Sequence, residues 1–560
     1  MSAEGQTGGL SRRTFLISLA ALAGCQPVEQ TAQSNDPTAP DASPIRFVDR
    51  AEDAGISYRL GHNGRSPLNI LDTAGCGCAF LDYNQDGLLD ILLVGQPHCA
   101  LYRNEGDGAF TDVTAQVGLN AAGTFMGCAV GDYDNDGYPD IFISGYGRNI
   151  LFHNNGGVTF SDVTAHAGLM SHGPYDWATS SVFADFNNDG RLDLAVGHYV
   201  TFTPETLQTC AYSGVQASCP PFYYHPQNLR VYENTGYGRF QDVTSPWGFN
   251  QGGHGNNLGL AASDYDGDGR MDLYVANDGL PGDLWHNVGQ GFRNEGAISG
   301  TAYSLNGSPQ AGMGVDWGDY DNDGLLDLIV SSFQDQPKAL YHNEGEGQFR
   351  FVSYAAGLGL QTINRLAFGV AWADFDNDGR LDLVFANGHV QDTINRIHPP
   401  ATYAQKAQCF HNRGDGTFED VSSGCGQAFQ TPIVGRGLAI GDYDNDGKPD
   451  ILMVNLEGKA LLLHNESPTR RWLGVRLIGS HSNRDGIGAQ ISLTAGGLRQ
   501  IREVQSGRSY LSACDIRALF GLGGATQIDS LTVRWPSGST QTVQTVGIDH
   551  YITVREGEKA

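Results

Sequence analysis

The residues with the clearest chemistry belong to a nine-residue acidic loop that occurs seven times along the chain. Asp or Asn stands at positions 1, 3, 5 and 9 of every copy and Gly at position 6, and the copies are DYNQDGLLD from Asp82, DYDNDGYPD from Asp132, DFNNDGRLD from Asp185, DYDGDGRMD from Asp264, DYDNDGLLD from Asp319, DFDNDGRLD from Asp374 and DYDNDGKPD from Asp442. Side-chain oxygens at these four positions, with the backbone carbonyl of position 7, form the oxygen-rich set that Ca²⁺ prefers. The glycine permits the tight turn that directs those oxygens inward. The sequence therefore predicts up to seven Ca²⁺ sites.

The expected ligands are the residues at loop positions 1, 3, 5, 7 and 9, with position 7 contributing its carbonyl. They are Asp82, Asn84, Asp86, Leu88, Asp90, Asp132, Asp134, Asp136, Tyr138, Asp140, Asp185, Asn187, Asp189, Arg191, Asp193, Asp264, Asp266, Asp268, Arg270, Asp272, Asp319, Asp321, Asp323, Leu325, Asp327, Asp374, Asp376, Asp378, Arg380, Asp382, Asp442, Asp444, Asp446, Lys448 and Asp450. Asn84 and Asn187 each lower the charge of their loop by one, so we expect the first and third sites to bind more weakly.

Two other interpretations of the loop fit the sequence less well. An EF-hand has a bidentate Glu at position 12 and lies between helices, whereas position 12 is apolar here, as in Leu93 and Ile143, and both flanks have strand composition. Ordinary Asp, Asn and Gly turns would explain one copy, since these are common turn residues. Seven copies with positions 1, 5, 6 and 9 unbroken favour a metal loop at the turn of a β-hairpin.

A second module alternates with the loops and completes a repeat of four strands. It reads LYRNEGDGAFTDVTAQVGL from Leu101 and recurs from Leu151 and Val231, with weaker copies from Leu284, Leu340 and Cys409 and a truncated one at Leu463. Each copy predicts two strands joined by an Asn/Gly turn, which with the loop hairpin gives the four strands of a propeller blade. The segment IRFVDRAEDAGI, residues 45–56, matches the piece missing after the truncated copy. We therefore predict a seven-bladed β-propeller over residues 45–468, closed by its amino-terminal strand.

The rest of the predicted fold lies outside the repeats. Residues 470–556 contain alternating strands such as WLGVRLIG and IDSLTVRWP without an acidic loop, so we predict a small C-terminal all-β domain there. Two longer repeats carry insertions, one with Cys210 and Cys219 and one with NGHVQDTINRIHPPATYAQ, which should project from one face. The fold class is thus all-β.

The amino terminus resembles an export signal. Residues 1–25 contain Arg12 and Arg13, an apolar run too short to span a membrane, and Cys25 within LAGC, which resembles a bacterial lipobox; the paired arginines resemble a twin-arginine signal. An ordinary secretory signal with two arginines is the alternative. Residues 26–44 are rich in Pro, Ser, Thr and Gln, as in a disordered tether. We expect a protein lipidated at Cys25 and anchored to the bacterial envelope through that lipid only, since no later segment has 18 uninterrupted apolar residues.

Export permits disulfides, and the net charge limits the possible partners. Cys210 and Cys219 are the best candidates for a disulfide, because they would close a small polar loop, and Cys409 with Cys425 is a weaker pair. The formal net charge is −28, and the loops contribute 26 of the 62 acidic side chains, four in each loop less Asn84 and Asn187. The absence of a basic patch argues against nucleic-acid binding.

The motifs quoted above resemble known families. The loop-plus-hairpin units resemble FG-GAP/VCBS repeats, the Ca²⁺-binding blades of integrin α-subunit propellers, and residues 472–554, with GVRLIGSHSNRDGIGAQISLTAGG and LTVRWPSG, resemble the ASPIC/UnbV domain. The combination is similar to bacterial members of the cartilage acidic protein-like family. This resemblance implies the same fold and Ca²⁺ loops, and a secreted or surface location.

Two functions are compatible with these features. The first is a monomeric binding, adhesion or scaffold protein that holds a glycan, matrix or surface-protein partner. The alternative is an enzyme, similar to a lyase or dehydratase, that acts on carbohydrate or a secondary metabolite in the propeller funnel. The sequence contains no GxSxG, HExxH or Walker motif. The enzyme would need several of His62, His225, His254, His389 and His398 to converge, so we predict no catalytic residue and favour the binding protein.

Overall fold

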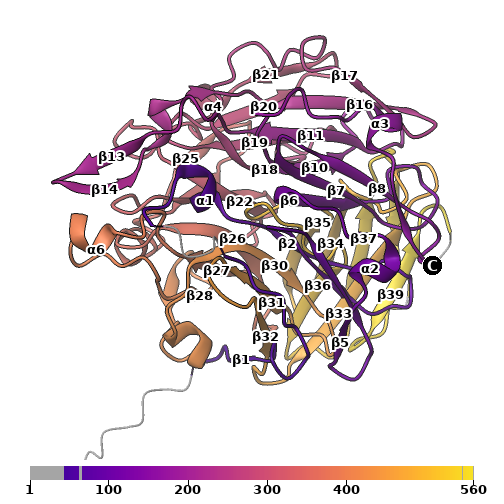
Figure 1. Ribbon diagram of the computed structural model, residues 1–560. Helices are drawn as coiled ribbons and strands as arrows, with labels where there is room; N and C mark the ends of the chain where they lie inside the picture. Colours follow the sequence, from indigo (N-terminus) through magenta and orange to yellow (C-terminus); the bar gives the residue numbers. More distant parts are fainter. Residues whose placement is uncertain (1–42, 62–65, 545, 559–560) are drawn as a thin grey trace, which may run out of the picture. The chain divides into compact units, whose positions relative to one another are not determined.

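Four-stranded antiparallel sheets make up most of the fold (Figure 1), as seen in the computed structural model, which describes residues 43–61, 66–544 and 546–558. The predicted export signal with Cys25, most of the tether, and His62 lie outside the described residues. Within the described chain no helix has the length and apolar character needed to cross a membrane.

Seven of these sheets follow one another along the described part of the chain, and we number them and their acidic loops 1 to 7. Sheet 1 comprises β2 (Cys78–Leu81), β3 (Asp90–Leu93), β4 (Ala100–Asn104) and β5 (Phe110–Asp112), and sheet 2 comprises β6 (Thr124–Gly131), β7 (Asp140–Tyr146), β8 (Ile150–Asn154) and β9 (Phe160–Asp162). Sheet 3 comprises β10 (Ala178–Ala184), β11 (Asp193–His198), β16 (Arg230–Gly236) and β17 (Arg239–Asp242), and sheet 4 comprises β18 (Asn257–Ser263), β19 (Asp272–Asn277), β20 (Asp283–Asn287) and β21 (Phe292–Asn294). Sheet 5 comprises β22 (Gly312–Gly318), β23 (Asp327–Ser332), β24 (Ala339–Asn343) and β25 (Phe349–Phe351), and sheet 6 comprises β26 (Ala367–Ala373), β27 (Asp382–Asn387), β28 (Gln408–Asn412) and β29 (Phe418–Asp420). Sheet 7 comprises β30 (Gly435–Gly441), β31 (Asp450–Asn455), β32 (Leu461–Asn465) and the amino-terminal strand β1 (Phe47–Asp49).

Each acidic loop is the turn between the first two strands of its sheet, as predicted. In sheet 1 the apolar strand β2 pairs with β3 so that Leu81 lies opposite Asp90, and the loop spans the residues between them. The flanking strands are almost entirely buried because the side chains on both faces of each sheet pack against neighbouring sheets. Short helices follow the fourth strand in four sheets: α2 (Thr114–Val117), α3 (Thr164–Ala167), α4 (Gly296–Ser299) and α5 (Gly359–Thr362).

The sheets close on themselves in a β-propeller-like arrangement. Their first strands contact one another in the order β2, β6, β10, β18, β22, β26, β30 and back to β2. The predicted closing strand is confirmed, since β1 pairs with β32 and places Phe47 opposite Asn465. Glycines let the first strands approach closely; a Cβ on Gly259 would lie 2.0 Å from the carbonyl oxygen of Met313 in the next sheet.

The C-terminal strands form two further sheets. One contains β36 (Ala518–Gly523), β33 (Arg471–Ile478) and β39 (Tyr551–Arg555), and the other contains β35 (Leu498–Glu503), β34 (Gln490–Ala495), β37 (Ser530–Arg534) and β38 (Thr540–Thr542). Their alternating apolar side chains pack into one cluster that includes Leu473, Ile491 and Trp535. Residues 43–560 together form one compact unit, so these sheets are packed against the repeats.

The connection between β35 and β36 enters the ring of first strands, which the sequence did not predict. We call residues 505–514 the inserted segment. Ser509 exchanges two backbone hydrogen bonds with Val315 of β22, of 2.9 and 2.7 Å, and Ala513 donates to the carbonyl of Cys78 at 3.0 Å. Leu511 donates its N–H to Ser180 Oγ of β10 at 3.0 Å. The inserted segment therefore ties together first strands that are distant in the sequence.

The two sequence insertions lie at the end of the sheets opposite the acidic loops. Adjacent strands are antiparallel, so connections between second and third strands emerge at the other end from the loops. One insertion carries β12 (Val200–Thr201), β13 (Thr209–Tyr212), β14 (Val215–Ser218), η1 (Pro221–Tyr223) and β15 (His225–Pro226), and the other carries α6 (Ile394–Ile397). Figure 1 shows the β13–β14 hairpin and α6 on the same side of the sheets, as predicted.

Candidate metal centres

The position-1 carboxylate organises each acidic loop. In all seven loops one of its oxygens accepts the N–H of the position-6 glycine, at 2.7–3.2 Å. The position-5 carboxylate in turn accepts the N–H of position 7, as Asp86 does from Leu88 at 2.9 Å. These bonds turn the loop so that the side chains of positions 1, 3, 5 and 9 face one another.

The position-9 carboxylate is the most deeply buried of the four acidic positions. Asp90 accepts the backbone N–H of Tyr83 at 3.1 Å and that of Asn104 at 2.9 Å. Burial nevertheless raises the pKa of Asp90 to about 8 and that of Asp140 to about 7. A buried carboxylate of this kind is most stable as an anion when a cation lies beside it.

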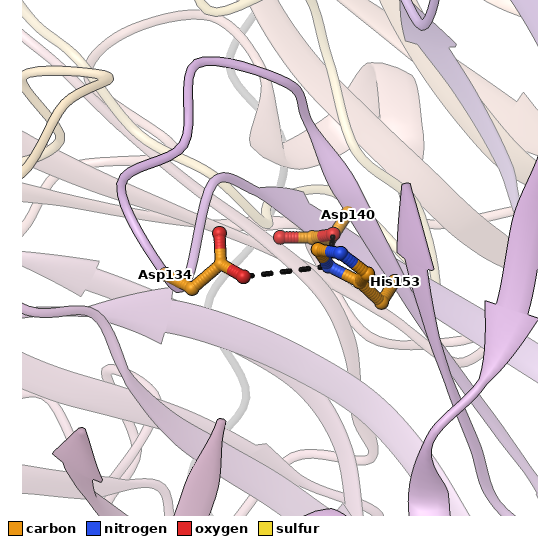
Figure 2. A group of neighbouring side chains, drawn as sticks. All are labelled: Asp134, Asp140 and His153. Atoms are coloured by element: carbon orange, nitrogen blue, oxygen red, sulfur yellow. Dashed lines mark ion pairs between the residues drawn. The ribbon is translucent and has the colours of Figure 1, made fainter. Parts of the chain in front are cut away.

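Five of the loops in the described chain also face a histidine from the third strand of their own sheet. In loop 2, His153 Nδ1 lies 3.2 Å from Asp140 and 3.4 Å from Asp134 (Figure 2). Equivalent clusters contain His286, His342, His411 and His464. The nearby Asp140 carboxylate is the main cause that raises the pKa of His153 to about 9. In loops 1 and 3, where position 3 is Asn, the corresponding residues are Arg103 and Glu233.

Buried asparagines connect each loop to the next around the ring. The last residue of the third strand is Asn in sheets 1, 2, 4, 5, 6 and 7, and Asn234 occupies the corresponding place in sheet 3. Each of these asparagines donates through Nδ2 to the carbonyl of position 2 in the preceding loop, at 2.7–3.0 Å; the donors are Asn104, Asn154, Asn234, Asn287, Asn343, Asn412 and Asn465. The seven loops are thus linked in a closed series, which the sequence analysis missed although the repeated Asn was visible in it.

The C-terminal sheets contact the acidic loops directly. Arg534 donates to the Asp264 carboxylate at 2.6 Å, and the Tyr551 hydroxyl donates to the Asp442 carboxylate at 2.7 Å. Arg470 forms an ion pair of 2.8 Å with Asp376. These contacts neutralise part of the acidic charge of loops 4, 6 and 7, whereas residues such as Asp134, Asp189 and Asp266 stay exposed.

The buried carboxylates of the acidic loops are suited to bind a hard cation. Asp264 Oδ1, Asp272 Oδ2 and Asp319 Oδ1 are buried carboxylate oxygens without a hydrogen-bond partner. Each belongs to position 1 or 9, where the sequence predicts a Ca²⁺ ligand, and a bound cation would satisfy it. In loops 3, 4, 6 and 7 the basic side chain at position 7 pairs with the position-5 carboxylate, as Lys448 does with Asp446 at 2.8 Å. In these four loops position 5 is therefore the ligand whose charge is compensated by its own loop.

The cysteines and the four described candidate histidines are placed as follows. Cys210 and Cys219 form a disulfide, whereas Cys409 and Cys425 are buried free thiols. His225 is exposed on β15, and His254 pairs with Asp283. His389 and His398 line one cavity at the end of the sheets that carries the insertions. The described histidines therefore do not converge as a set.

The comparisons with known proteins follow the same division of the chain. The FG-GAP-like repeat family matches residues 82–143, 132–196, 222–275, 264–330, 319–385 and 401–453, and the ASPIC and UnbV family matches residues 479–560. Cartilage acidic protein 1 of Mus musculus is 27% identical over 48% of this chain and 40% of its own length. Cartilage acidic protein 1 of Homo sapiens is 26% identical over 53% of this chain and 43% of its own length. The matches thus span less than half the length of these relatives.

One similar solved structure is an Agrocybe aegerita lectin described as recognising non-reducing terminal N-acetylglucosamine. It is 17% identical, with a TM-score of 0.38, over 70% of this chain and 93% of the lectin. A similarity at this level supports no statement about function.

Proposed function

The chain belongs to the FG-GAP-like repeat family and carries a C-terminal ASPIC and UnbV domain, and from this premise we propose that it is an exported calcium-binding protein that binds a partner or acts as a scaffold. The propeller has seven blades in this proposal, one for each four-stranded sheet. Its binding partner is a glycan, a matrix component or a surface protein.

The buried, unpaired carboxylate oxygens of the acidic loops carry this proposal. Four carboxylates at about 5 Å repel one another by roughly 3 kcal/mol per pair at an effective dielectric of about 20. Ca²⁺ would remove that repulsion through the side chains of positions 1, 3, 5 and 9 and the position-7 carbonyl. Because the Asn bonds connect every loop to its neighbour, ordering the loops would stiffen the whole ring.

The free face for a partner is the one that carries the two insertions. The C-terminal strands already contact three of the acidic loops, whereas the insertion that contains η1 exposes 78% of Phe222 and 52% of Tyr223. Adjacent exposed aromatic side chains are common in sites that bind proteins or glycans. A rigid ring presenting this face suits a binding protein.

Export and lipid attachment at Cys25 complete the proposal. A lipid on Cys25 and a tether over residues 26–44 would display the folded part at the bacterial envelope. If Cys25 is lipidated, Cys25→Ala releases the protein into the soluble fraction. Retention of that variant in the membrane fraction would contradict the lipid anchor without affecting calcium binding.

A capture experiment tests the binding function. The full-length protein, immobilised in Ca²⁺, is exposed to native envelope or matrix extract, and bound material is eluted with EDTA. We expect a component that is retained with Ca²⁺ and lost in EDTA. The control is a Phe222→Ser/Tyr223→Ser variant, which should retain less of it. Equal retention by both proteins would exclude this face as the partner site.

A further inference from the structure

A cavity of about 440 Å³ opens at the end of the sheets opposite the acidic loops, within the range typical of small-molecule sites. We call it the insertion cavity. Most of its lining is apolar and comes from distant parts of the chain, including Ile70, Leu258, Met313, Phe333, Phe368 and Ile394. Tyr510 of the inserted segment also lines it, so the C-terminal strands contribute to this cavity.

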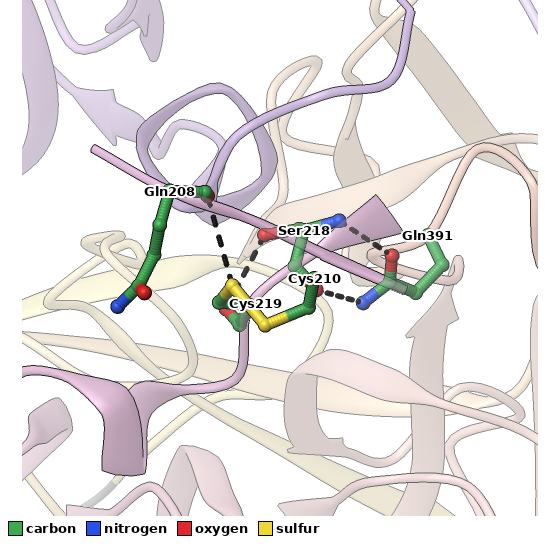
Figure 3. The surroundings of a disulfide bond; sticks show 5 residues. All are labelled: Gln208, Cys210, Ser218, Cys219 and Gln391. Carbon is green, nitrogen blue, oxygen red and sulfur yellow. Dashed lines mark hydrogen bonds between the residues drawn. A yellow bond between two sulfur atoms is a disulfide. The ribbon is translucent and has the colours of Figure 1, made fainter. Parts of the chain in front are cut away.

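The two insertions are fastened to each other where they wall the cavity. The Gln391 side chain accepts the N–H of Ser218 at 3.0 Å and donates to its carbonyl at 2.9 Å (Figure 3). The adjacent Cys210–Cys219 disulfide fixes the base of the β13–β14 hairpin. The two hydrogen bonds of the Gln391 side chain and the disulfide hold this wall in place before a ligand binds. Binding would therefore cost little conformational entropy in this wall.

A second set of hydrogen bonds supports another part of the lining. The Lys338 ammonium group is fully buried and donates to the carbonyls of Phe333 at 3.3 Å, Gln336 at 3.3 Å and Arg365 at 2.7 Å. Phe333 and Gln336 both line the cavity. Their positions are therefore fixed by the fold, and Gln334 between them is fixed as well.

Asp278 places a negative charge in this apolar lining. Its Oδ2 accepts the Tyr199 hydroxyl at 2.6 Å, and its backbone is held to Asn256 by bonds of 2.9 and 3.0 Å. Among the described residues no Lys, Arg or His nitrogen lies within 4.0 Å of its carboxylate. A buried carboxylate without a cationic neighbour favours a cationic ligand and disfavours an anionic one.

Two further buried polar atoms in the lining have no partner. His389 Nδ1 accepts the N–H of Gln391 at 2.9 Å, which places the imidazole proton on Nε2. That Nε2 is buried without an acceptor, and Gln334 Oε1 is buried without a donor. Burial, with Arg436 nearby, lowers the pKa of His389 to about 3, so the ring is neutral. Among the described lining residues, the buried polar atoms that lack a partner are thus one donor, at His389, and one acceptor, at Gln334, and the Asp278 carboxylate adds a second acceptor.

We propose that the insertion cavity binds a small, mainly apolar amine, with its ammonium group at Asp278 and Gln334 and a hydroxyl or carbonyl oxygen at His389 Nε2. A sugar fits less well, because most of its hydroxyl groups would face apolar side chains without a partner. An anionic ligand fits less well too, because the Asp278 carboxylate would repel it. This inference goes beyond the proposed function, since it does not depend on the acidic loops and its polar groups, Asp278, Gln334 and His389, are distinct from the exposed aromatic residues, of which Phe222 also lines the cavity.

Direct titration of the Ca²⁺-saturated protein tests the inference without any mutation. The probes are tyramine and serotonin, each with an ammonium group and a phenolic oxygen; their neutral counterpart is p-ethylphenol, and their anionic counterpart is p-hydroxyphenylacetate. By isothermal titration calorimetry we expect one saturable site for an amine, at least tenfold weaker binding of p-ethylphenol, and no binding of the acid. Absence of amine binding, or equal affinity for all probes, overturns the inference.

Variants locate the site. Asp278→Asn should weaken amine binding at least tenfold and bring it to the level of p-ethylphenol. The matched control is Asp335→Asn on the exposed rim, at a φ of 64° that Asn also tolerates, and its affinity should stay within about twofold. Amine binding that survives Asp278→Asn overturns the inference. Neither result affects the calcium proposal, which is measured separately by Ca²⁺-dependent melting.

Discussion

Asn104 in sheet 1 donates a hydrogen bond of 2.8 Å from Nδ2 to the backbone carbonyl of Tyr443 in loop 7. The same amide also donates to the carbonyl of Leu89 in its own loop at 3.0 Å, and its Oδ1 accepts the N–H of Gly106 at 3.0 Å. This side chain joins the first loop to the last. Together with the pairing of β1 and β32 it closes the ring at two separate places.

We expect Asn104→Ala to destabilise the closed ring. The substitution leaves the buried carbonyls of Leu89 and Tyr443 without their side-chain donor, which costs about 1–3 kcal/mol in the free energy of unfolding. Urea unfolding of the full chain measures it. Asn155→Ala is the control, because Asn155 is exposed and bonds only to Thr159 and Ser161; it should change stability by less than about 0.5 kcal/mol. Equal stability of both variants would show that the Asn104 bonds contribute nothing.

The repeats were predictable because their information is local. The spacing of Asp82, Asp86, Gly87 and Asp90 specifies a turn and its metal-binding side chains, and the apolar stretches on either side specify the hairpin. The seven loops and their hairpins follow from such patterns, and the closing strand was predicted because residues 45–56 match the piece missing from the last repeat. The Asn at the end of each third strand was equally visible, but its partner lies in another sheet. A side chain's long-range partner is not encoded in its own neighbourhood.

The inserted segment could not be predicted for the same reason. Residues 505–514, QSGRSYLSAC, are mostly small or polar and have no strand alternation, although they belong to the stretch that resembles the ASPIC/UnbV domain. Their partners lie far away in the sequence: Ser506 bonds to Phe183 and Ser509 to Val370. The composition resembles an exposed loop, although Ser506, Ser509 and Ser512 are buried. Burial here follows from the shape of the ring, which only the assembled structure provides.

The ion pair between Arg508 and Asp316 allows a test of how much the inserted segment stabilises the ring. Asp316 is fully buried on β22, and its carboxylate lies 3.2 Å from Arg508 while it accepts the N–H groups of Trp317 and Trp372 at 2.9 Å. Arg508→Met leaves this charge without its counterion, so we expect a loss of about 3–5 kcal/mol in unfolding free energy. The double variant Arg508→Met/Asp316→Asn removes both charges and should regain part of it. A single variant as stable as wild type would contradict the pairing.

Removal of calcium should lower the melting temperature markedly. EDTA would leave the carboxylates of the loops unscreened from one another, and the Asn bonds would spread the disorder of one loop to its neighbours. Differential scanning fluorimetry in EDTA, and after excess Ca²⁺ is restored, measures the effect, since a ligand that binds only the folded state stabilises it. Excess Mg²⁺ is the control and should restore less, because it requires a tighter octahedral site. An unchanged melt in EDTA would contradict the stabilising role of the metal.

The side chains beside loops 1 and 3 refine the expectation that these two loops bind Ca²⁺ more weakly than the others. In loop 3, Glu233 accepts a hydrogen bond from Asn187 at 3.3 Å and so brings a carboxylate beside the position where one is missing. In loop 1 the corresponding residue is Arg103, which pairs with Glu105 at 2.8 Å and adds no carboxylate to the loop. Loop 1 should therefore be the weakest. We expect Asn84→Asp/Arg103→His to raise the number of tightly bound Ca²⁺ ions by one, as counted by equilibrium dialysis with elemental analysis. The single variant Glu233→Gln should lower that number; no change in either would refute this ranking.

Glu556 makes the stability of the C-terminal sheets depend on pH. One carboxylate oxygen accepts the N–H groups of Ser480, His481 and Ser482 at 2.8–2.9 Å, and the other accepts the Ser482 hydroxyl at 3.0 Å. Burial opposes ionisation, but the bond from Ser482, then that from the Ser537 hydroxyl, and then those from Ser480 and His481 hold the pKa of Glu556 at about 2, below its ordinary value of 4.5.

A group with a lowered pKa stabilises the folded state above its ordinary pKa, and this contribution is lost as the pH falls toward its folded value. We therefore expect Glu556→Gln to destabilise the protein by about 1.5–3 kcal/mol at neutral pH, the range for hydrogen bonds to a charged group. The difference from wild type should shrink as the pH falls from about 4.5 to about 2, and urea unfolding across that range measures it. Because the acidic loops titrate equally in both proteins, the difference isolates Glu556. A difference that stays constant with pH would show that its charge does not hold the three N–H groups.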